Sequence, residues 1–251
     1  KKNKFGINTE FAINGYRAAM RLENINVVGI DCHIGSQITE TGPFIEALSN
    51  LKSMIRGLMD YGINIKYLDM GGGLGITYND EEPPHPVEYA AAIKESIGDM
   101  KVKLILEPGR VIVGNAGILV TKVLYRKSTD EKEFVIVDAG MNDLVRPTLY
   151  KAFHAIKPVV ISGEGEMTAD IVGPICESGD FMALGRIMPK VGQGELLSVM
   201  SAGAYGFVMS SNYCSRLKIP EVMVRDDKFY VARKRQKYED LTRGENIPSF
   251  L

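Results

Sequence analysis

The stretch that decides the fold lies at residues 63–75 and reads INIKYLDMGGGLG. Its first eight residues are mostly apolar, with a pattern typical of a short buried strand. Three consecutive glycines follow, and there backbone N–H groups can approach an anion such as phosphate. A tight turn is the alternative interpretation. The spacing is not GxGxxG, which disfavours a dinucleotide-binding fold, whereas α/β barrels bind phosphate at the carboxyl ends of their strands.

Strands and helices alternate on both sides of this stretch. Residues 25–30 (INVVGI) and 102–106 (VKLIL) also predict strands, so three predicted strands begin at intervals of 38 and 39 residues. A helix is predicted from residue 42 to Gly62, because apolar residues recur at helical steps; they are Phe44, Leu48, Leu51, Ile55 and Leu58. Helices are also predicted at 8–22 and 86–97. This order predicts successive βα units with a parallel sheet.

The pattern changes after about Gly109, where short strand-like runs separated by turns replace the βα units. Strands are predicted at 111–113, 118–125, 134–137, 158–161, 196–200 and 229–232, with one helix at 147–154. The predicted fold class is therefore α/β plus β. Residues 1–111 are expected to form successive βα units, and residues 112–251 a mostly-β barrel or sandwich domain.

Composition excludes several classes of protein. The 251 residues are 45% hydrophobic with a formal net charge of −1, which indicates a globular protein rather than a disordered one. There is no basic surplus to favour nucleic acid, and no run approaches the ~20 apolar residues of a membrane span. The cysteines stand at 32, 176 and 214, a spacing that suggests neither zinc nor any other metal site and favours a reducing, cytoplasmic setting.

Polar residues follow the first and third predicted strands. His33 and Ser36 lie just past the first, and Glu107 and Arg110 end the third. His33 can stack on a flat ring and Ser36 can bind phosphate, while Glu107 can hold a cationic ring nitrogen beside an anion held by Arg110. A loop histidine bonded to the backbone and a local ion pair are the alternatives. Because the carboxyl ends of parallel strands share one edge, we expect a single site.

The second half carries three further candidate segments. MNDLVRPTLY (141–150) places Arg146 and Tyr150 four residues apart, and GPICESGD (173–180) places Cys176 beside Glu177. A thiol in such a loop can serve as an acid, although a small buried apolar role for Cys176 is the alternative. Tyr205 stands between glycines, either exposed or with a packed ring.

Together these segments resemble the diaminopimelate decarboxylases, which belong to the fold-type III pyridoxal-phosphate enzymes. The resemblance rests on HIGSQI (33–38), LDMGGGLGI (68–76), EPGR (107–110), VDAGMNDLVRPTLY (137–150), GPICESGD (173–180) and GAYGF (203–207). It extends over nearly the whole chain. It implies pyridoxal 5′-phosphate as cofactor, decarboxylation of meso-2,6-diaminopimelate to L-lysine, and a homodimer with shared active sites.

The resemblance also implies a role for each matching residue. His33 would stack on the pyridine ring and Glu107 would pair with its nitrogen. The rest of the cofactor site would comprise Ser36, Gly71, Gly72, Gly73, Gly109, Arg110 and Tyr205. The substrate would be bound by Arg110, Arg146, Tyr150, Glu177 and Tyr205, with Glu177 on the distal ammonium. Cys176 would protonate the substrate carbon, and both Cys176 and Glu177 would reach into the partner subunit's site.

One motif of that family does not occur in the sequence. In that family the lysine that forms the Schiff base with the cofactor lies in a Tyr-x-x-Lys-Ala-Asn segment. In addition, only about 110 residues precede the β half of this chain, whereas a full (β/α)8 barrel takes ~250 residues. The resemblance therefore implies that residues 1–111 are the C-terminal part of a (β/α)8 barrel of the TIM type. We expect the chain to be the C-terminal portion of such an enzyme, inactive alone. The alternatives are a non-catalytic relative and a decarboxylase of ornithine or carboxynorspermidine; Arg146 and the Cys176–Glu177 pair disfavour the latter.

Overall fold

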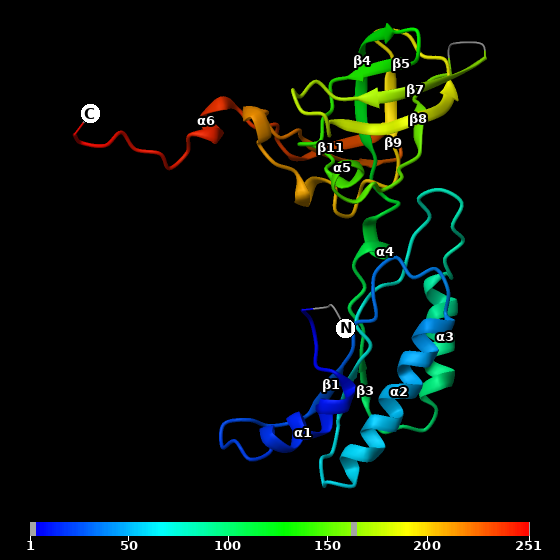
Figure 1. Cartoon of the computed structure of the whole chain (residues 1–251), viewed down its shortest axis with the longest axis vertical. Helices are drawn as coiled ribbons and strands as arrows, with labels where there is room; N and C mark the ends of the chain where they lie inside the picture. The colour runs from blue at the N-terminus through cyan, green and yellow to red at the C-terminus, as the bar shows by residue number, and fades with distance from the viewer. Residues whose placement is uncertain (1–3, 162–164, 251) are drawn as a thin grey trace. The chain divides into compact units, whose positions relative to one another are not determined.

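The computed structural model describes residues 4–161 and 165–250. Its contacts divide the chain into two compact units, Lys1–Ile112 and Val113–Leu251, and each is described by itself (Figure 1). The boundary predicted from the sequence is 111/112. Within the described ranges, no helix is both long enough and apolar enough to cross a bilayer.

The first unit alternates helices and strands. Its elements are α1 (Thr9–Ala19), β1 (Gly29–Asp31), α2 (Gly42–Met59), β2 (Tyr67–Asp69), α3 (Pro86–Ile97), β3 (Lys103–Ile105) and the start of α4 (Arg110–Val113). The three strands form a parallel sheet in the order β1-β2-β3. The predicted βα alternation is confirmed, although each strand is shorter than the apolar run that predicted it.

Helices α2 and α3 lie side by side against one face of this sheet (Figure 1). The buried side chains of α2 are the predicted apolar stripe: Phe44, Leu48, Leu51, Ile55 and Leu58. Ile30, Leu68 and Leu104 stand in register on the three strands and pack into the same cluster. Because side chains alternate along a strand, Asp31, Asp69 and Ile105 point to the opposite face.

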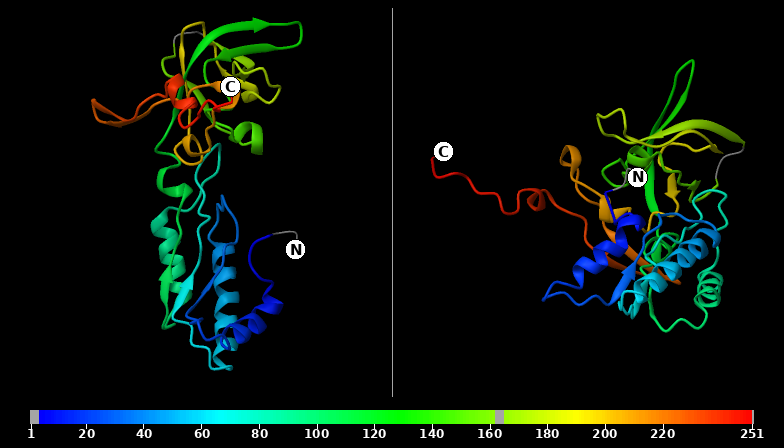
Figure 2. Two further views of the ribbon diagram at one scale, coloured as in Figure 1. Left: turned by 90° about the vertical axis from the view of Figure 1, so that its left-hand side faces the viewer. Right: turned by 60° about the horizontal axis from the view of Figure 1, so that its bottom comes forward.

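The second unit is mostly β. It contains β4 (Leu119–Ser128), β5 (Glu133–Val137), α5 (Arg146–Tyr150), β6 (Ile156–Pro158), β7 (Glu166–Val172), β8 (Phe181–Pro189), β9 (Leu196–Val199), β10 (Glu221–Arg225), β11 (Lys228–Arg233) and α6 (Tyr238–Leu241). Six strands form a sheet in the order β6-β9-β4-β5-β7-β8, and β10 and β11 form a separate hairpin (Figure 2). Within the six-stranded sheet, only the β5–β7 pair is parallel. Its core includes Val123, Val135, Ile171, Leu197 and Val199.

Some predictions for the second half are wrong. Residues 111–113 lie in α4 rather than in a strand, because the carbonyl of Gly109 accepts the amide of Ile112 and closes a helical turn. The helix predicted at 147–154 ends at Tyr150, where Lys151 takes a left-handed conformation (φ 52°). Strands β7, β8 and β10 were not predicted.

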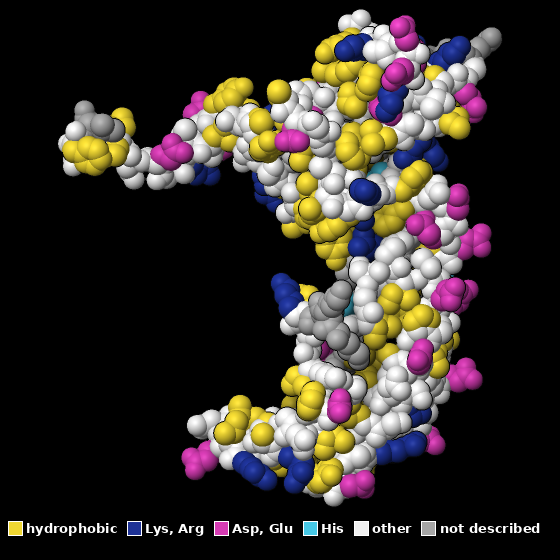
Figure 3. Space-filling view, viewed as in Figure 1, with side chains coloured by type: hydrophobic (Ala, Val, Ile, Leu, Met, Phe, Trp, Pro, Cys, Tyr) yellow, Lys and Arg dark blue, Asp and Glu magenta, His cyan; other side chains and the backbone are white. Residues whose placement is uncertain are grey.

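Many apolar side chains remain exposed on both units (Figure 3). The β10–β11 hairpin is the clearest case, with Met223, Val224, Phe229 and Tyr230 each about 70% exposed. An apolar surface of this kind is typical of a region that another protein surface covers.

Candidate functional site

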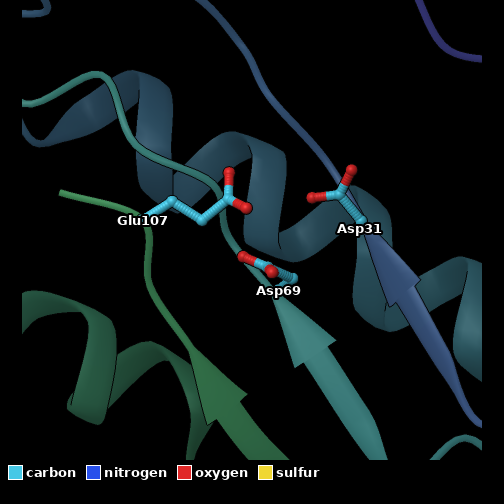
Figure 4. A group of neighbouring side chains, drawn as sticks. All are labelled: Asp31, Asp69 and Glu107. Carbon is cyan, nitrogen blue, oxygen red and sulfur yellow. The ribbon is translucent and has the colours of Figure 1, made fainter. Parts of the chain in front are cut away.

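Three carboxylates meet where the strands of the first unit end. Asp31 closes β1, Asp69 closes β2, and Glu107 lies two residues beyond β3, so all three point to the same face of the sheet. Their oxygens lie within 4.8 Å of one another (Figure 4). Asp31 and Asp69 were not identified from the sequence, although each is an aspartate at the end of an apolar strand-like run.

This cluster has a strongly negative character. Partial burial raises the pKa of Asp31 above its ordinary value, the nearby charge of Asp69 raises it further, and His33 acts in the opposite direction. A cation or a protonated ring nitrogen placed here would relieve the repulsion between the carboxylates. The geometry therefore suits either a metal ion or a cationic heterocycle.

The glycine loop after β2 is tightly enclosed by the other two loops. A Cβ added to Gly71 would lie 2.5 Å from the carbonyl oxygen of Cys32, and one on Gly73 would lie 2.5 Å from that of Gly35. A Cβ on Gly72 would collide with the carbonyl oxygen of Glu107. The backbones approach so closely that packing alone requires glycine at all three positions.

Some polar backbone groups of the glycine loop are hydrogen-bonded within the described part of the protein, and two of its amides are not. The N–H of Gly71 donates to Asp69 Oδ1 at 2.8 Å, and the carbonyls of Gly71 and Gly73 accept the amides of Glu107 and Ile38 at 2.8 and 2.9 Å. Among the described residues, no acceptor contacts the amides of Gly72 and Gly73. Two adjacent open N–H donors are what an anion such as phosphate requires.

Arg110 joins the first and third strand ends. Its Nη2 donates to Ser36 Oγ at 3.0 Å and its Nη1 donates to the hydroxyl of Tyr78. Tyr78 is buried, with the guanidinium 5.6 Å from its ring centroid. A cation and a hydroxyl donor therefore lie together near the glycine loop.

Gln37 and Tyr78 were not identified from the sequence. Gln37 is left-handed (φ 59°), and its side chain exchanges hydrogen bonds with both backbone groups of Ile76. No local sequence pattern marks either residue, because each forms its hydrogen bond with a residue at least 32 positions away in the chain.

The predicted candidates of the first unit do come together. His33 Nδ1 lies 3.1 Å from the position a Gly71 Cβ would take, and Gly109 begins the turn that carries Arg110. The edge thus collects His33, Ser36, Gly71, Gly72, Gly73, Glu107, Gly109 and Arg110. The prediction that these strand ends form one site is consistent with this arrangement.

In the second unit, Asp180 fixes the loop that carries Cys176 and Glu177. Its two buried carboxylate oxygens accept the amides of Met141 and Ile175, each at 2.6 Å. Cys176 itself is exposed, so the alternative that it is a buried apolar residue is wrong.

Glu177 lines a cavity of about 350 Å³ together with Met141, Val145, Ser211 and Tyr213. One carboxylate oxygen accepts the amide of Gly179 at 3.2 Å, and the other accepts the hydroxyl of Tyr213 at 3.4 Å. The charges of Cys214 and Glu177 raise the pKa of Tyr213, which therefore stays a donor. An acidic oxygen at such a cavity suits an ammonium group.

Arg146 and Tyr150 stand on the same short helix, α5. The Arg146 side chain is buried with Nη1 2.8 Å from Nε2 of His154, whereas Tyr150 is exposed. Thr148, between them, donates to the carbonyl of Gly179 at 2.5 Å, which attaches α5 to the Cys176–Glu177 loop. Tyr205 is left-handed (φ 58°) and 41% exposed.

Comparison with known proteins shows which enzymes the chain resembles. Residues 1–114 match the family model described as "Pyridoxal-dependent decarboxylase, pyridoxal binding domain". The chain is 50% identical over 240 residues to the diaminopimelate decarboxylase of Aquifex aeolicus, covering 95% of this chain and 57% of that protein. It is 48% identical over 247 residues to that of Pseudomonas fluorescens, covering 98% and 59%.

The solved structures that resemble this chain include diaminopimelate decarboxylases. The diaminopimelate decarboxylase of Helicobacter pylori, complexed with L-lysine, superposes with a TM-score of 0.89 at 40% identity, covering 97% of this chain and 60% of that one. The enzyme of M. jannaschii, also with L-lysine, gives 0.93 at 37% identity, covering 100% and 59%. The chain thus spans about three-fifths of the length of these relatives. It is similar to the pyridoxal-dependent decarboxylases over residues 1–114, and over nearly its whole length it is similar to the diaminopimelate decarboxylases.

Proposed function

We propose that these residues are the C-terminal portion of a diaminopimelate decarboxylase, a carboxy-lyase that converts meso-2,6-diaminopimelate to L-lysine and CO2. One observation carries the proposal: open amides, a hydroxyl and a guanidinium lie at the same strand edge as a carboxylate cluster. Pyridoxal phosphate has the matching pair of groups, an anionic phosphate and a basic ring nitrogen.

The residues present fit this cofactor. The amides of Gly72 and Gly73, the Ser36 hydroxyl and Arg110 would hold the phosphate. Glu107 would keep a proton on the ring nitrogen, and the adjacent charges of Asp31 and Asp69 favour that proton. His33 would lie against the ring, and the backbone of Gly109 would complete the cofactor site. When bound, pyridoxal phosphate accepts the electron pair left as CO2 departs.

The second unit supplies groups suited to the substrate. Arg146, Tyr150 and Tyr205, together with Arg110, would bind carboxylates, of which diaminopimelate has two. Glu177 would hold the distal ammonium at its cavity. The exposed Cys176 thiol would deliver a proton to the substrate carbon.

We also propose a homodimer with shared active sites, in which Cys176 and Glu177 serve the partner subunit's site. The exposed apolar hairpin β10–β11 and the exposed position of Cys176 support it. By the same resemblance, residues 1–111 are part of a (β/α)8 barrel and residues 112–251 a β barrel or sandwich domain. Free cysteines at 32, 176 and 214 suit a cytoplasmic enzyme.

The test uses a completed enzyme, in which these 251 residues are joined to the part of the A. aeolicus relative that the match leaves uncovered. We expect it to release CO2 from meso-diaminopimelate with pyridoxal phosphate, and to prefer that substrate to ornithine. A preference for ornithine, or no release from either substrate by the folded protein, would contradict the proposal.

A further inference from the structure

His154 is a fully buried histidine to which none of these roles is assigned. It lies four residues beyond the end of α5, and its side chain is 0% exposed. Its Nε2 lies 2.8 Å from Nη1 of Arg146, and its Nδ1 lies 2.8 Å from the carbonyl oxygen of Met200. Both ring nitrogens are therefore within hydrogen-bond distance of a fixed group.

These two contacts determine which nitrogen carries the proton. A carbonyl oxygen can only accept, so Nδ1 must be the one that donates to Met200. A guanidinium can only donate, so Nε2 must present its lone pair to Arg146. Both bonds form together only in the neutral Nδ1–H tautomer. With a proton on Nε2, the Nε2–H group of His154 and the Nη1–H group of Arg146 would face each other, and neither could accept a hydrogen bond.

The backbone around His154 is anchored to two strands of the sheet. The amide of Met200, just after β9, donates to the carbonyl of Ala155 at 2.8 Å. Nη1 of Arg186, on β8, donates to the carbonyl of His154 at 2.8 Å, with its guanidinium carbon 3.9 Å from the ring centroid of Phe153. The imidazole itself is thus fixed at Nδ1 by Met200, whereas Arg186 contacts only the backbone carbonyl of His154.

We propose that His154 is a positioning residue that orients the Arg146 guanidinium toward a substrate carboxylate. The inference rests on the proposed function, since Arg146 is placed there in the substrate site. A hydrogen bond at Nη1 fixes the plane of the guanidinium, and the direction of its other N–H groups follows from that plane. Without the acceptor, Arg146 would bind the carboxylate from a wider range of orientations.

The first experiment tests the tautomer on the full chain and needs no activity. The sequence has three histidines, at 33, 85 and 154, so long-range ¹H–¹⁵N spectra of the imidazoles give three patterns. The pattern lost in His154→Gln identifies His154. We expect the Nδ1–H form at pH 7; an Nε2–H or doubly protonated ring would overturn the proposal.

The second experiment measures KM and kcat of the completed enzyme. Loss of the acceptor in His154→Leu should raise KM for meso-diaminopimelate about 10-fold while kcat changes less than about threefold, as for a binding interaction. His154→Gln, whose side-chain oxygen can accept from Arg146, should recover most of that loss. Arg186→Met is the matched control, because it disturbs the same turn but not the imidazole, and its KM should stay near the unmodified value.

An unchanged KM in His154→Leu, or an equal rise in Arg186→Met, would overturn the positioning role. If His154→Leu does not fold, the tautomer measurement still decides it, because it needs only the unmodified chain and the assignment from His154→Gln. Failure of the unmodified completed enzyme to turn over the substrate counts against the proposed function instead, and the tautomer measurement distinguishes the two cases.

Discussion

The guanidinium of Arg110 donates a hydrogen bond to the hydroxyl of Ser36 over 3.0 Å, between residues 74 positions apart in the chain. The bond connects the loop after β3 with the loop after β1, on either side of the glycine loop after β2. It brings a cation and a hydroxyl to the two open amides of Gly72 and Gly73. An anion bound there would be contacted from all three strand ends.

Ser36→Ala should weaken binding of pyridoxal phosphate to the completed enzyme about 10-fold, because one hydrogen bond to a charged phosphate is lost. Equilibrium dialysis of the cofactor measures this. Ser53→Ala is the control, since Ser53 is an exposed residue of α2 that bonds to its own helix. Equal affinity in the two variants would remove Ser36 from the cofactor site.

Gly72→Ala should destabilise the protein by about 1–3 kcal/mol, because the new Cβ would collide with the carbonyl oxygen of Glu107. Urea unfolding of the chain measures the change. Gly42→Ala is the matched control, because a Cβ at the start of α2 meets nothing within 4 Å. Similar unfolding midpoints for the two variants would show that the loop is not tightly enclosed.

Glu107→Gln should lower kcat of the completed enzyme by about 10²-fold while the cofactor stays bound, because a neutral amide cannot keep a proton on the ring nitrogen. Glu133→Gln, at an exposed salt bridge in the second unit, should leave kcat unchanged. Near-normal turnover in Glu107→Gln would contradict the role given to this carboxylate.

Cys32 should react slowly with iodoacetamide. Burial, together with the charges of Asp31 and Asp69, raises the pKa of its thiol to about 11, so little thiolate is present at pH 8. Mass spectrometry of the labelled chain should show the exposed Cys176 modified before Cys32, and labelling of Cys32 should accelerate as the pH rises toward 11. Labelling of Cys32 as fast as Cys176 at pH 8 would contradict the buried environment.

The first unit was largely predictable because its signals are local. The five apolar residues of α2 recur at helical steps and all five are buried. The bounds of α3 match the predicted 86–97, since Pro86 begins the helix and His85 and Glu88 form a capping box. The meeting of the strand ends followed from the parallel topology alone.

The features that were missed depend on contacts between distant residues. In β7, the carboxylate of Asp170 is buried and is bound by Lys132 and by the amide of Gly185. A charged residue at a buried position interrupts the alternation of apolar and polar residues by which a strand is predicted. The carboxylate cluster depends on the register that pairs Asp31 with Asp69. His154 has no local signal, because its partners are Arg146 and Met200.

We propose that these residues supply the cofactor-binding edge and substrate groups of a diaminopimelate decarboxylase, and that the lysine that binds pyridoxal phosphate covalently lies outside them. The most direct measurement is borohydride reduction of the chain and of the completed enzyme, each with pyridoxal phosphate, followed by peptide mapping. We expect a pyridoxyl group on one lysine of the added part, lysine production by the completed enzyme, and no specific adduct on the chain alone. A pyridoxyl adduct on one specific lysine of the 251 residues, together with lysine production by the chain alone, would contradict it.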